Sequence, residues 1–295
     1  MLNLRSAGLS YEELYGAAYA LVLRKRGDVL YDAICDTVTD HLCLHITCKI
    51  ADVAGDEEFL RDLQERFVSH RRSARMLADV FIYLDRVHLQ RSATKNLEPV
   101  EKLCMTLWCE CVVNNPRIRR RMRSCMLDMI RRERDGDTVS GDALREVTSM
   151  LMTLGESVYV DEFETNMLDE TTSYYRALAQ KRIDMDDCPT YLKMAETRLE
   201  GERRRAEAYM APRTFSLVLG EAKDQLLKEM SQSLLYNASS GLVHMLRANQ
   251  TENLRRMYAL FSGADDLMGM PDVIFNHLKE MGKSIVTDSE NEANP

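Results

Sequence analysis

The sequence has few residues that break helices or turn strands, since its 295 residues include only 13 Gly and 6 Pro. A strand-rich fold needs a turn about every 8–12 residues, so this scarcity excludes such a fold and predicts long helices. No apolar run approaches the roughly 20 residues that a membrane span requires. Basic residues are also in the minority, with 39 Lys and Arg against 47 Asp and Glu. The net charge of −8 argues against a protein that coats nucleic acid or an anionic membrane.

The eight cysteines lack the CxxC pairing of a zinc or redox site. They stand singly in helical patterns, which indicates reduced, packed residues of a cytoplasmic or nuclear protein. The densest group of possible metal ligands is Cys35, His41, Cys43, His45 and Cys48. Because these positions point in diverging directions on a helix, we expect no metal site, but packed cysteines with exposed histidines.

Catalytic motifs are missing as well. The sequence contains no Gly-rich phosphate loop, no GxSxG elbow and no HExxH pair. We therefore expect neither an enzyme nor a cofactor. The chain does have enough apolar residues to form a sizeable hydrophobic core, since 45% of its residues are apolar and 29% are charged.

The first helix is marked by Ser10 and Glu13, which have the spacing of a capping box. This signal predicts a helix over 11–26, with Gly27 as the glycine that follows its last turn. Further helical patterns cover the remainder of the chain. They run over 29–49, from 59 into the eighties with a break near 69–73, and over 97–113, 117–133 and 142–154. After a linker that carries Tyr159 and Phe163 they continue over 168–181, 190–210, 214–236, 242–247, 252–261 and 272–286.

The helix that follows Pro116 has a dense arginine face opposite an apolar face. Its arginines, and a later cluster, could bind phosphates: Arg117, Arg119, Arg120, Arg121, Arg123, Arg131, Arg132, Arg134, Arg203, Arg204 and Arg205. Acidic neighbours of the later groups and the lack of interleaved aromatic residues favour a solvated, self-paired face. A helical-repeat scaffold that binds RNA or acidic partners through this face is the alternative.

Three tyrosines form a stripe on the first helix, because Tyr11, Tyr15 and Tyr19 stand at positions i, i+4 and i+8. The neighbouring face holds apolar residues: Leu14, Ala17, Ala18 and Leu21. Ordinary core packing is the simpler interpretation of this periodicity. A protein interface is the other, because tyrosine is amphipathic and loses little entropy on immobilisation.

Several ordered sequence blocks resemble the cullin family. The run from Leu9 to Tyr31, LSYEELYGAAYALVLRKRGDVLY, is similar to the first conserved block of that family and is closest to its cullin-3 branch. Five further blocks follow in family order: DVFIYLDRV from Asp79, LDMIRRER from Leu127, GESVY with DEFE from Gly155, SGLVHML with ENLRRMYALF from Ser240, and HLKEMGK from His277. The resemblance covers residues 9–286.

The resemblance implies an all-α fold, an elongated stalk of stacked cullin-repeat helical bundles. It places repeat 1 at 9–115, repeat 2 at 116–240, a partial repeat 3 at 241–286 and a disordered tail at 287–295. It further implies a scaffold subunit of a cullin-RING ubiquitin ligase in ubiquitin-dependent protein catabolism.

In the cullin-3 branch a BTB-domain adaptor docks on the first repeat. By motif position, the implied contact residues are Ser10, Tyr11, Leu14, Tyr15, Tyr19, Leu23, Lys25, Tyr83, Arg86 and His88. No nucleic-acid or membrane partner is expected.

The sequence departs from the family pattern in two ways. Only eight residues precede Leu9, so we expect repeat 1 to lack one helix. The segment that recruits the RING-box protein and accepts a ubiquitin-like modifier has no counterpart here, so we expect no RING-box protein on this chain. The chain is then either a competitor that occupies adaptors or a segment of a longer ligase subunit.

Overall fold

A computed structural model describes residues 10–89, 97–262 and 265–292, with the backbone alone at 88–89, 265–266 and 287–292. Within these ranges every regular element is helical and no strand occurs. The all-α, stacked-bundle fold that the sequence predicts is thus confirmed. None of the described helices has the length and apolar content to cross a membrane. The chain divides into two compact units, Met1–Asn166 and Met167–Pro295.

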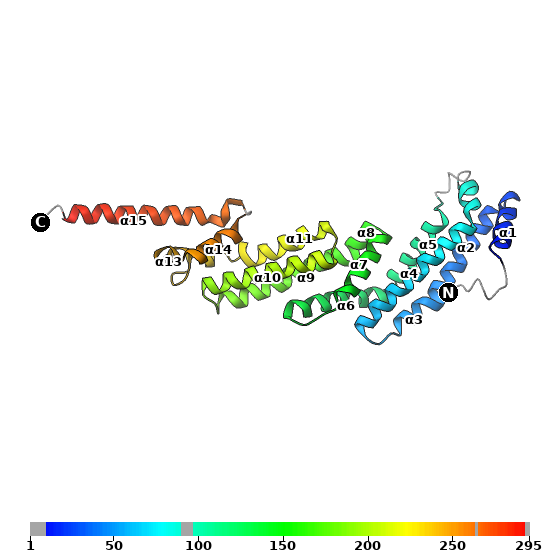
Figure 1. The fold of residues 1–295 in the computed structure, drawn as a ribbon, viewed down its shortest axis with the longest axis horizontal. Helices are drawn as coiled ribbons and strands as arrows, with labels where there is room; N and C mark the ends of the chain where they lie inside the picture. The colour runs from blue at the N-terminus through cyan, green and yellow to red at the C-terminus, as the bar shows by residue number, and fades with distance from the viewer. Residues whose placement is uncertain (1–9, 90–96, 263–264, 293–295) are drawn as a thin grey trace. The chain divides into compact units, whose positions relative to one another are not determined.

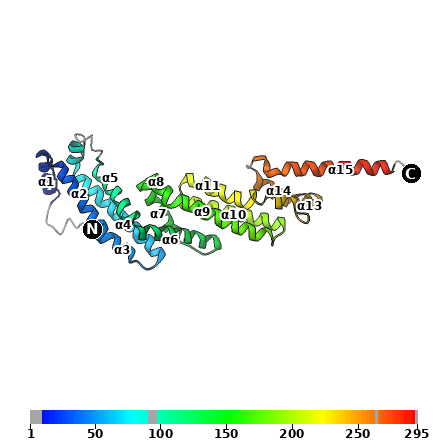
Figure 2. The same cartoon turned by 180° about the vertical axis from the view of Figure 1, so that it is seen from behind.

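Unit 1 is a set of packed helices whose order along the chain is seen in Figures 1 and 2. Its α-helices are α1 (Tyr11–Leu23), α2 (Gly27–His41), α3 (Thr47–Ala51), α4 (Asp56–Val80), α5 (Val100–Trp108), α6 (Pro116–Asp135), α7 (Gly141–Leu154) and α8 (Glu156–Tyr159). Four π-helical turns interrupt or extend them: η1 (Leu42–Ile46), η2 (Leu84–Leu89), η3 (Cys109–Val113) and η4 (Val160–Glu164).

The helices of unit 2 follow from α9 (Thr165–Ile183), which begins at the unit boundary. They are α10 (Cys188–Tyr209), α11 (Pro212–Lys223), α12 (Ser231–Tyr236), α13 (Leu242–Arg247), α14 (Thr251–Phe261) and α15 (Met270–Glu292), with η5 (Asp224–Lys228) and the 3-10 turn η6 (Asp265–Gly269). The helix α15 extends through Glu292, although the polar composition predicts a disordered tail from residue 287. The division into two units does not decide the repeat boundaries, which stay a prediction.

Helix α4 is the packing centre of unit 1, since it contacts α1, α3, α5, α6 and α7. Its buried side chains include Phe59, Leu63 and Phe67, and the ring of Phe67 lies 5.6 Å from that of Trp108. The break predicted near 69–73 is wrong, because α4 runs unbroken for 25 residues. The Ser73 hydroxyl donates to the Ser69 carbonyl 3.1 Å away, within the helix, so these serines do not end it.

The predicted linker after α7 is also wrong. Tyr159 and Phe163 lie in α8 and η4, both side chains are buried, and their rings are 5.5 Å apart. The linker was predicted because the segment is short of helical periodicity. A π-helical turn shifts the register of side chains by one position, and this shift hides the apolar pattern of a continuous helix.

Unit 2 has one apolar core, built from α9 to α15 around Tyr191, Leu226 and Phe261. A buried polar contact crosses it: the Tyr175 hydroxyl donates to Glu202 at 2.5 Å, and Glu202 pairs with Arg205 at 2.7 Å. This pairing satisfies a carboxylate that has no exposed surface.

The cysteine prediction holds for only part of the set. Cys104, Cys125 and Cys188 are buried, as predicted, whereas Cys43 and Cys48 are exposed. Burial is the largest cause that raises the pKa of the Cys125 thiol to about 12. The exposed pair lies on the solvent side of η1 and α3, which a helical pattern alone does not distinguish from the core side.

His70 occupies a half-buried position between α4 and α5. Its ring lies 5.0 Å from that of Trp108, and Nε2 is 2.9 Å from the Cys104 carbonyl, so the neutral ring donates this bond. Burial lowers the pKa of His70 below its ordinary 6.5, against the smaller opposing effect of the Cys104 bond. Folding of unit 1 therefore favours the neutral form of the His70 ring.

Acidification should destabilise unit 1 through this histidine. When the folded pKa is below the unfolded pKa, the unfolded chain takes up the proton first, so stability falls as pH drops below about 6.5. We expect His70→Gln, which keeps an N–H donor for Cys104, to show a smaller loss of stability between pH 7.5 and 5.5. Urea unfolding followed by the fluorescence of Trp108, the single tryptophan, measures it. An equal loss in both proteins would contradict the assignment.

Candidate functional site

Four tyrosines form a continuous row at one end of unit 1. The rings of Tyr11 and Tyr15 are 6.3 Å apart, those of Tyr15 and Tyr19 are 6.3 Å apart, and Tyr19 lies 4.5 Å from Tyr83 of the α4–η2 connection. We call these four residues the aromatic row. Tyr11 is 55% and Tyr19 is 38% exposed, so the row is open to solvent along much of its length. Core packing alone, the simpler interpretation of the periodicity, does not describe it.

Helix α1 carries the row because its other side is held to the bundle. The capping box forms as predicted, with Ser10 Oγ accepting from the Glu13 amide and Glu13 accepting from the Ser10 amide. Ala18 and Val22 face the core, and α1 packs against α2, α4 and η2. The Tyr11 hydroxyl donates to the Asp79 carbonyl at 2.9 Å. This bond ties the first turn of α1 to the end of α4.

The turn that carries Tyr83 is held in place by a residue that sequence reasoning missed. The Asp85 carboxylate accepts two bonds from the Val100 amide, at 3.1 and 3.3 Å, and so joins η2 to the first turn of α5. Burial raises the pKa of Asp85 above its ordinary value. The only sequence signal that could have identified Asp85 was its position between Tyr83 and Arg86 in the second family-like block. Asp85 is a positioning residue for Tyr83.

The end of α1 differs from the prediction. The helix stops at Leu23, and the left-handed residue after it is Lys25, with φ of 57°, whereas Gly27 begins α2. The Lys25 amide donates to Val22 and the Arg26 amide donates to Leu21, both at 3.0 Å, which is a Schellman cap. Gly27 was chosen because glycine is the usual residue for this turn, but the chain turns two residues earlier.

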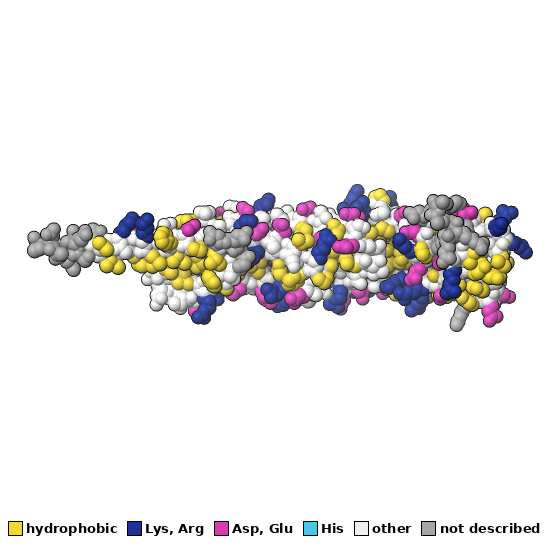
Figure 3. Space-filling view, turned by 90° about the horizontal axis from the view of Figure 1, so that it is seen from above, with side chains coloured by type: hydrophobic (Ala, Val, Ile, Leu, Met, Phe, Trp, Pro, Cys, Tyr) yellow, Lys and Arg dark blue, Asp and Glu magenta, His cyan; other side chains and the backbone are white. Residues whose placement is uncertain are grey.

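The other predicted contact residues lie around the aromatic row. Leu14 and Tyr15 are half-buried, Leu23 is 56% exposed at the last turn of α1, and Lys25 and Arg86 are exposed. His88 belongs to η2, where the structure describes its backbone but not its side chain. Figure 3 shows hydrophobic side chains beside basic ones at the end of unit 1 that carries α1. The structure thus brings the row, an apolar helix end and two cations to one region.

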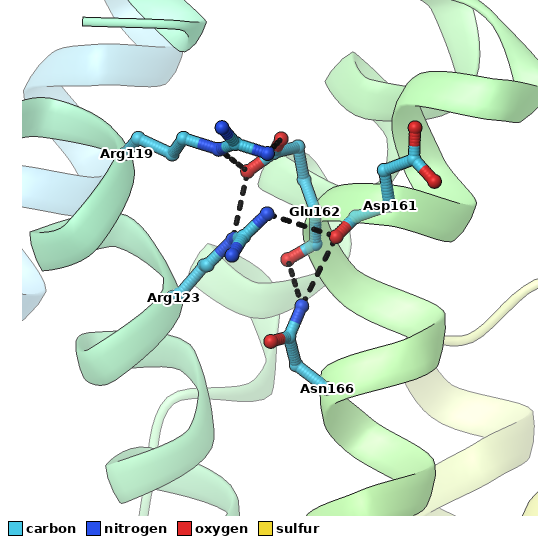
Figure 4. Close-up of polar contacts among 5 residues, drawn as sticks. All are labelled: Arg119, Arg123, Asp161, Glu162 and Asn166. Atoms are coloured by element: carbon cyan, nitrogen blue, oxygen red, sulfur yellow. Dashed lines mark hydrogen bonds and ion pairs between the residues drawn. The ribbon is translucent and has the colours of Figure 1, made fainter. Parts of the chain in front are cut away.

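The arginine face of α6 is largely committed to contacts within unit 1. Arg119 and Arg123 both bind Glu162, whose side chain is 3% exposed, at 2.8 Å each (Figure 4). Arg123 also donates to the Asp161 carbonyl, and the Asn166 amide donates to the Asp161 and Glu162 carbonyls. These arginines join α6 to η4, so they are not presented for a phosphate backbone.

Arg121 is committed in the same way. It donates to the carbonyls of Val53, Ala54 and Gly55 in the loop before α4, and its guanidinium lies 4.4 Å from the centre of the Phe59 ring. The self-paired interpretation of the arginine face therefore agrees with the contacts of these side chains. Arg117 and Arg120 remain exposed on α6.

The cysteine and histidine group near η1 does not converge. Among the residues that the structure describes, no group of three or more His, Cys, Asp or Glu side chains could hold a metal ion. The rings of His41 and His45 lie 5.8 Å apart on neighbouring turns.

Comparison with known proteins gives matches over the whole chain. The family description "Cullin alpha solenoid domain" matches residues 1–295. Cullin-3A of Arabidopsis thaliana is 34% identical over 294 residues, which are 99% of this chain and 40% of that protein. Cullin-3 of Dictyostelium discoideum is 33% identical over 289 residues, 97% of this chain and 37% of that protein. Cullin-4A of Homo sapiens is 29% identical over 283 residues, 95% of this chain and 36% of that protein. The chain thus spans about two fifths of the length of these relatives.

Lys25→Gly should stabilise unit 1. A left-handed backbone costs a residue with a Cβ about 1–2 kcal/mol, part of which is offset by the greater freedom of glycine in the unfolded chain. We expect the free energy of unfolding, measured by Trp108 fluorescence, to rise by about 0.5–1 kcal/mol. Arg26→Gly is the matched control, because Arg26 has a negative φ, and it should not stabilise. A loss of stability in Lys25→Gly would contradict the cap.

Glu162→Gln should destabilise unit 1, because it leaves two arginines without their carboxylate. Breaking a fully buried pair costs about 3–5 kcal/mol, and the partial exposure of Arg119 and Arg123 reduces this to roughly 2 kcal/mol. Asp161→Asn is the control, since the Asp161 side chain is exposed and only its carbonyl is used. Urea unfolding should separate the two variants, and equal stability would contradict the assigned contact.

Proposed function

This chain belongs to the cullin family, and from that premise we propose that it acts as a non-catalytic scaffold of a cullin-RING ubiquitin ligase. We further propose that unit 1 binds a BTB-domain substrate adaptor through the aromatic row. The cullin-3 relatives support the choice of adaptor class. The observation that carries the proposal is the aromatic row, in which Tyr11 and Tyr19 are exposed and Tyr15 and Tyr83 are half-buried.

The row has the physical properties of an interface anchor. Each tyrosine offers a large apolar ring and a hydroxyl, and the rings already contact one another, so their ordering costs little on binding. The Tyr11 bond to Asp79 and the Asp85 bonds to Val100 fix the two elements that carry the rings. Preorganised aromatic side chains near the centre of an interface supply a large share of the binding energy.

The charges near the row suit a rim rather than a centre. Lys25 and Arg86 are exposed, and a fully solvated ion pair contributes only about 0–1 kcal/mol to binding. They would steer an acidic adaptor rim toward the row and so raise the association rate at low salt. Affinity then depends on the rings and Leu23, and selectivity depends on the cations.

RNA binding through α6 has less support. Three of the α6 arginines are already used within unit 1: Arg119 and Arg123 bind Glu162, and Arg121 binds the loop before α4. Recruiting them to a phosphate backbone would break these contacts and leave Glu162 buried without a partner.

Truncation of single rings in the row should weaken adaptor binding while leaving the fold intact. We expect Tyr19→Ala and Tyr83→Ala each to weaken binding to a BTB domain at least tenfold, because each removes a partly exposed ring of an interface anchor. Isothermal titration against a panel of BTB domains measures the affinity, and Trp108 fluorescence checks that unit 1 is folded.

Tyr236→Ala is the matched control, since Tyr236 is 62% exposed in unit 2, outside the proposed site. Tyr19→Phe keeps the ring and should retain most of the affinity. The proposal fails if no BTB domain of the panel binds the folded chain, or if Tyr19→Ala and Tyr83→Ala bind as tightly as the Tyr236→Ala control.

A further inference from the structure

Two cysteines meet where the neighbouring helices α2 and α5 end. The helices lie side by side in unit 1 (Figure 1). Cys43 lies in the π-helical turn η1 after α2, Cys111 lies in η3 after α5, and the two turns pack against each other. The thiols of Cys43 and Cys111 are in hydrogen-bond contact. Cys43 is exposed and Cys111 is half-buried. We call these two residues the η1–η3 dithiol.

Hydrogen bonds hold the two helices together at both of their ends. Beside the dithiol, the Thr47 hydroxyl donates to the Leu42 carbonyl at 2.9 Å and, more weakly, to the Cys111 carbonyl at 3.5 Å. At the other end, the Tyr31 hydroxyl donates to the Glu98 carbonyl at 2.9 Å and accepts from the Glu98 amide at 3.2 Å. The two chain segments between this bond and the dithiol are of nearly equal length, so α2 and α5 run in parallel. The packing of the helices therefore fixes the position of the dithiol.

Other thiols near η1 are placed differently. Cys48 is exposed on α3, and its Sγ donates to the Cys43 carbonyl at 4.0 Å, so it is directed at the backbone. Cys35 is half-buried on α2 and acts on Cys111 through charge, whereas Cys43 also makes a hydrogen bond with Cys111. Of the described thiols, Cys43 is thus the one placed to react with Cys111.

We propose that the η1–η3 dithiol is a redox modification site, at which hydrogen peroxide joins Cys43 to Cys111 in a disulfide. In the first step the Cys43 sulfur attacks a peroxide oxygen, the O–O bond breaks, and Cys43 becomes a sulfenic acid as one water leaves. In the second step the Cys111 sulfur attacks the Cys43 sulfur and the S–O bond breaks. The Cys111 proton leaves with the hydroxyl as a second water. The two thiols lose two electrons, and the peroxide gains them.

The surroundings of the two thiols set the order of these steps. Burial is the largest cause that raises the pKa of Cys111 to about 12, followed by the contact with Cys43. The thiolate is the reactive form and must meet the oxidant in solvent, so the exposed Cys43 reacts first. A Cys43 that carries oxygen no longer forms a thiolate, so its charge ceases to raise the pKa of Cys111. The first step therefore favours the second.

Oxidation would stabilise the two helices that support the aromatic row. Helix α2 begins directly after the cap of α1, and α5 begins at Val100, whose amide holds Asp85. The disulfide closes the long stretch of chain between η1 and η3, and such a cross-link removes conformational freedom from the unfolded chain. Unit 1 is therefore more stable when oxidised. The inference needs no bound adaptor, so it and the proposed adaptor site can fail independently.

Peptide mapping of the full chain after treatment with hydrogen peroxide tests the proposal. We expect a peptide pair linked through Cys43 and Cys111, which dithiothreitol separates. Thermal unfolding followed by Trp108 fluorescence should show a midpoint higher by about 5 °C or more after oxidation. Cys43→Ser should form no such link and show no rise. Cys48→Ser is the matched control, because Cys48 is also exposed near η1, and it should behave as the parent does.

A reagent for neighbouring thiols tests the same pair without oxidation. Phenylarsine oxide binds two thiols at one arsenic atom, and the second bond gains from the high effective concentration of a neighbouring thiol. We expect the reduced parent and Cys48→Ser to bind it, and Cys43→Ser and Cys111→Ser to bind about tenfold more weakly.

Three results would overturn the proposal. The first is that peroxide leaves Cys43 and Cys111 unlinked in the folded parent, and the second is that Cys43 pairs with Cys35 or Cys48 instead. The third is that Cys43→Ser binds the arsenical as tightly as Cys48→Ser does, or shows the same rise in midpoint.

Discussion

Unit 1 depends on α4 remaining one straight helix with apolar side chains on several sides. Phe59 lies under the Arg121 guanidinium of α6, while Phe67 packs on Trp108 of α5. The backbone carbonyl of Asp79, near the last turn of α4, receives the Tyr11 hydroxyl. The position of the aromatic row is therefore set by a helix that takes no part in the row itself.

Helix α1 is held to the bundle by few buried side chains and by hydrogen bonds. It buries only two small side chains, Ala18 and Val22, which is little apolar area for a helix of 13 residues. Hydrogen bonds add to this anchorage, from Tyr11 to α4 and within the capping box at Ser10. Small core residues keep α1 close to α2, and the large rings remain on the side that faces solvent.

Local signals allowed the sequence to predict most of the fold. Ser10 and Pro116 act through nearest neighbours, so the starts of α1 and α6 are where these residues predict them. The errors arise where tertiary contacts decide. The left-handed turn falls at Lys25, two residues before α2 begins at Gly27, and Asp85 has a role because the α5 amide of Val100 comes near it. The stripe of Tyr11, Tyr15 and Tyr19 was predicted from its spacing, but the contact of Tyr19 with Tyr83 and the exposure of Tyr11 and Tyr19 required the structure.

Charge and apolar surface are used differently in this chain. Two arginines of α6, Arg119 and Arg123, are paired inside unit 1 with the buried Glu162 carboxylate. An ion pair completed within the fold offers a partner little, because a new contact must first break the old one. The apolar rings exposed on α1 have no such competitor among the described contacts, so a partner can bury them without first breaking an ion pair. The proposed adaptor site accordingly relies on the hydrophobic face of α1, with Lys25 and Arg86 at its rim.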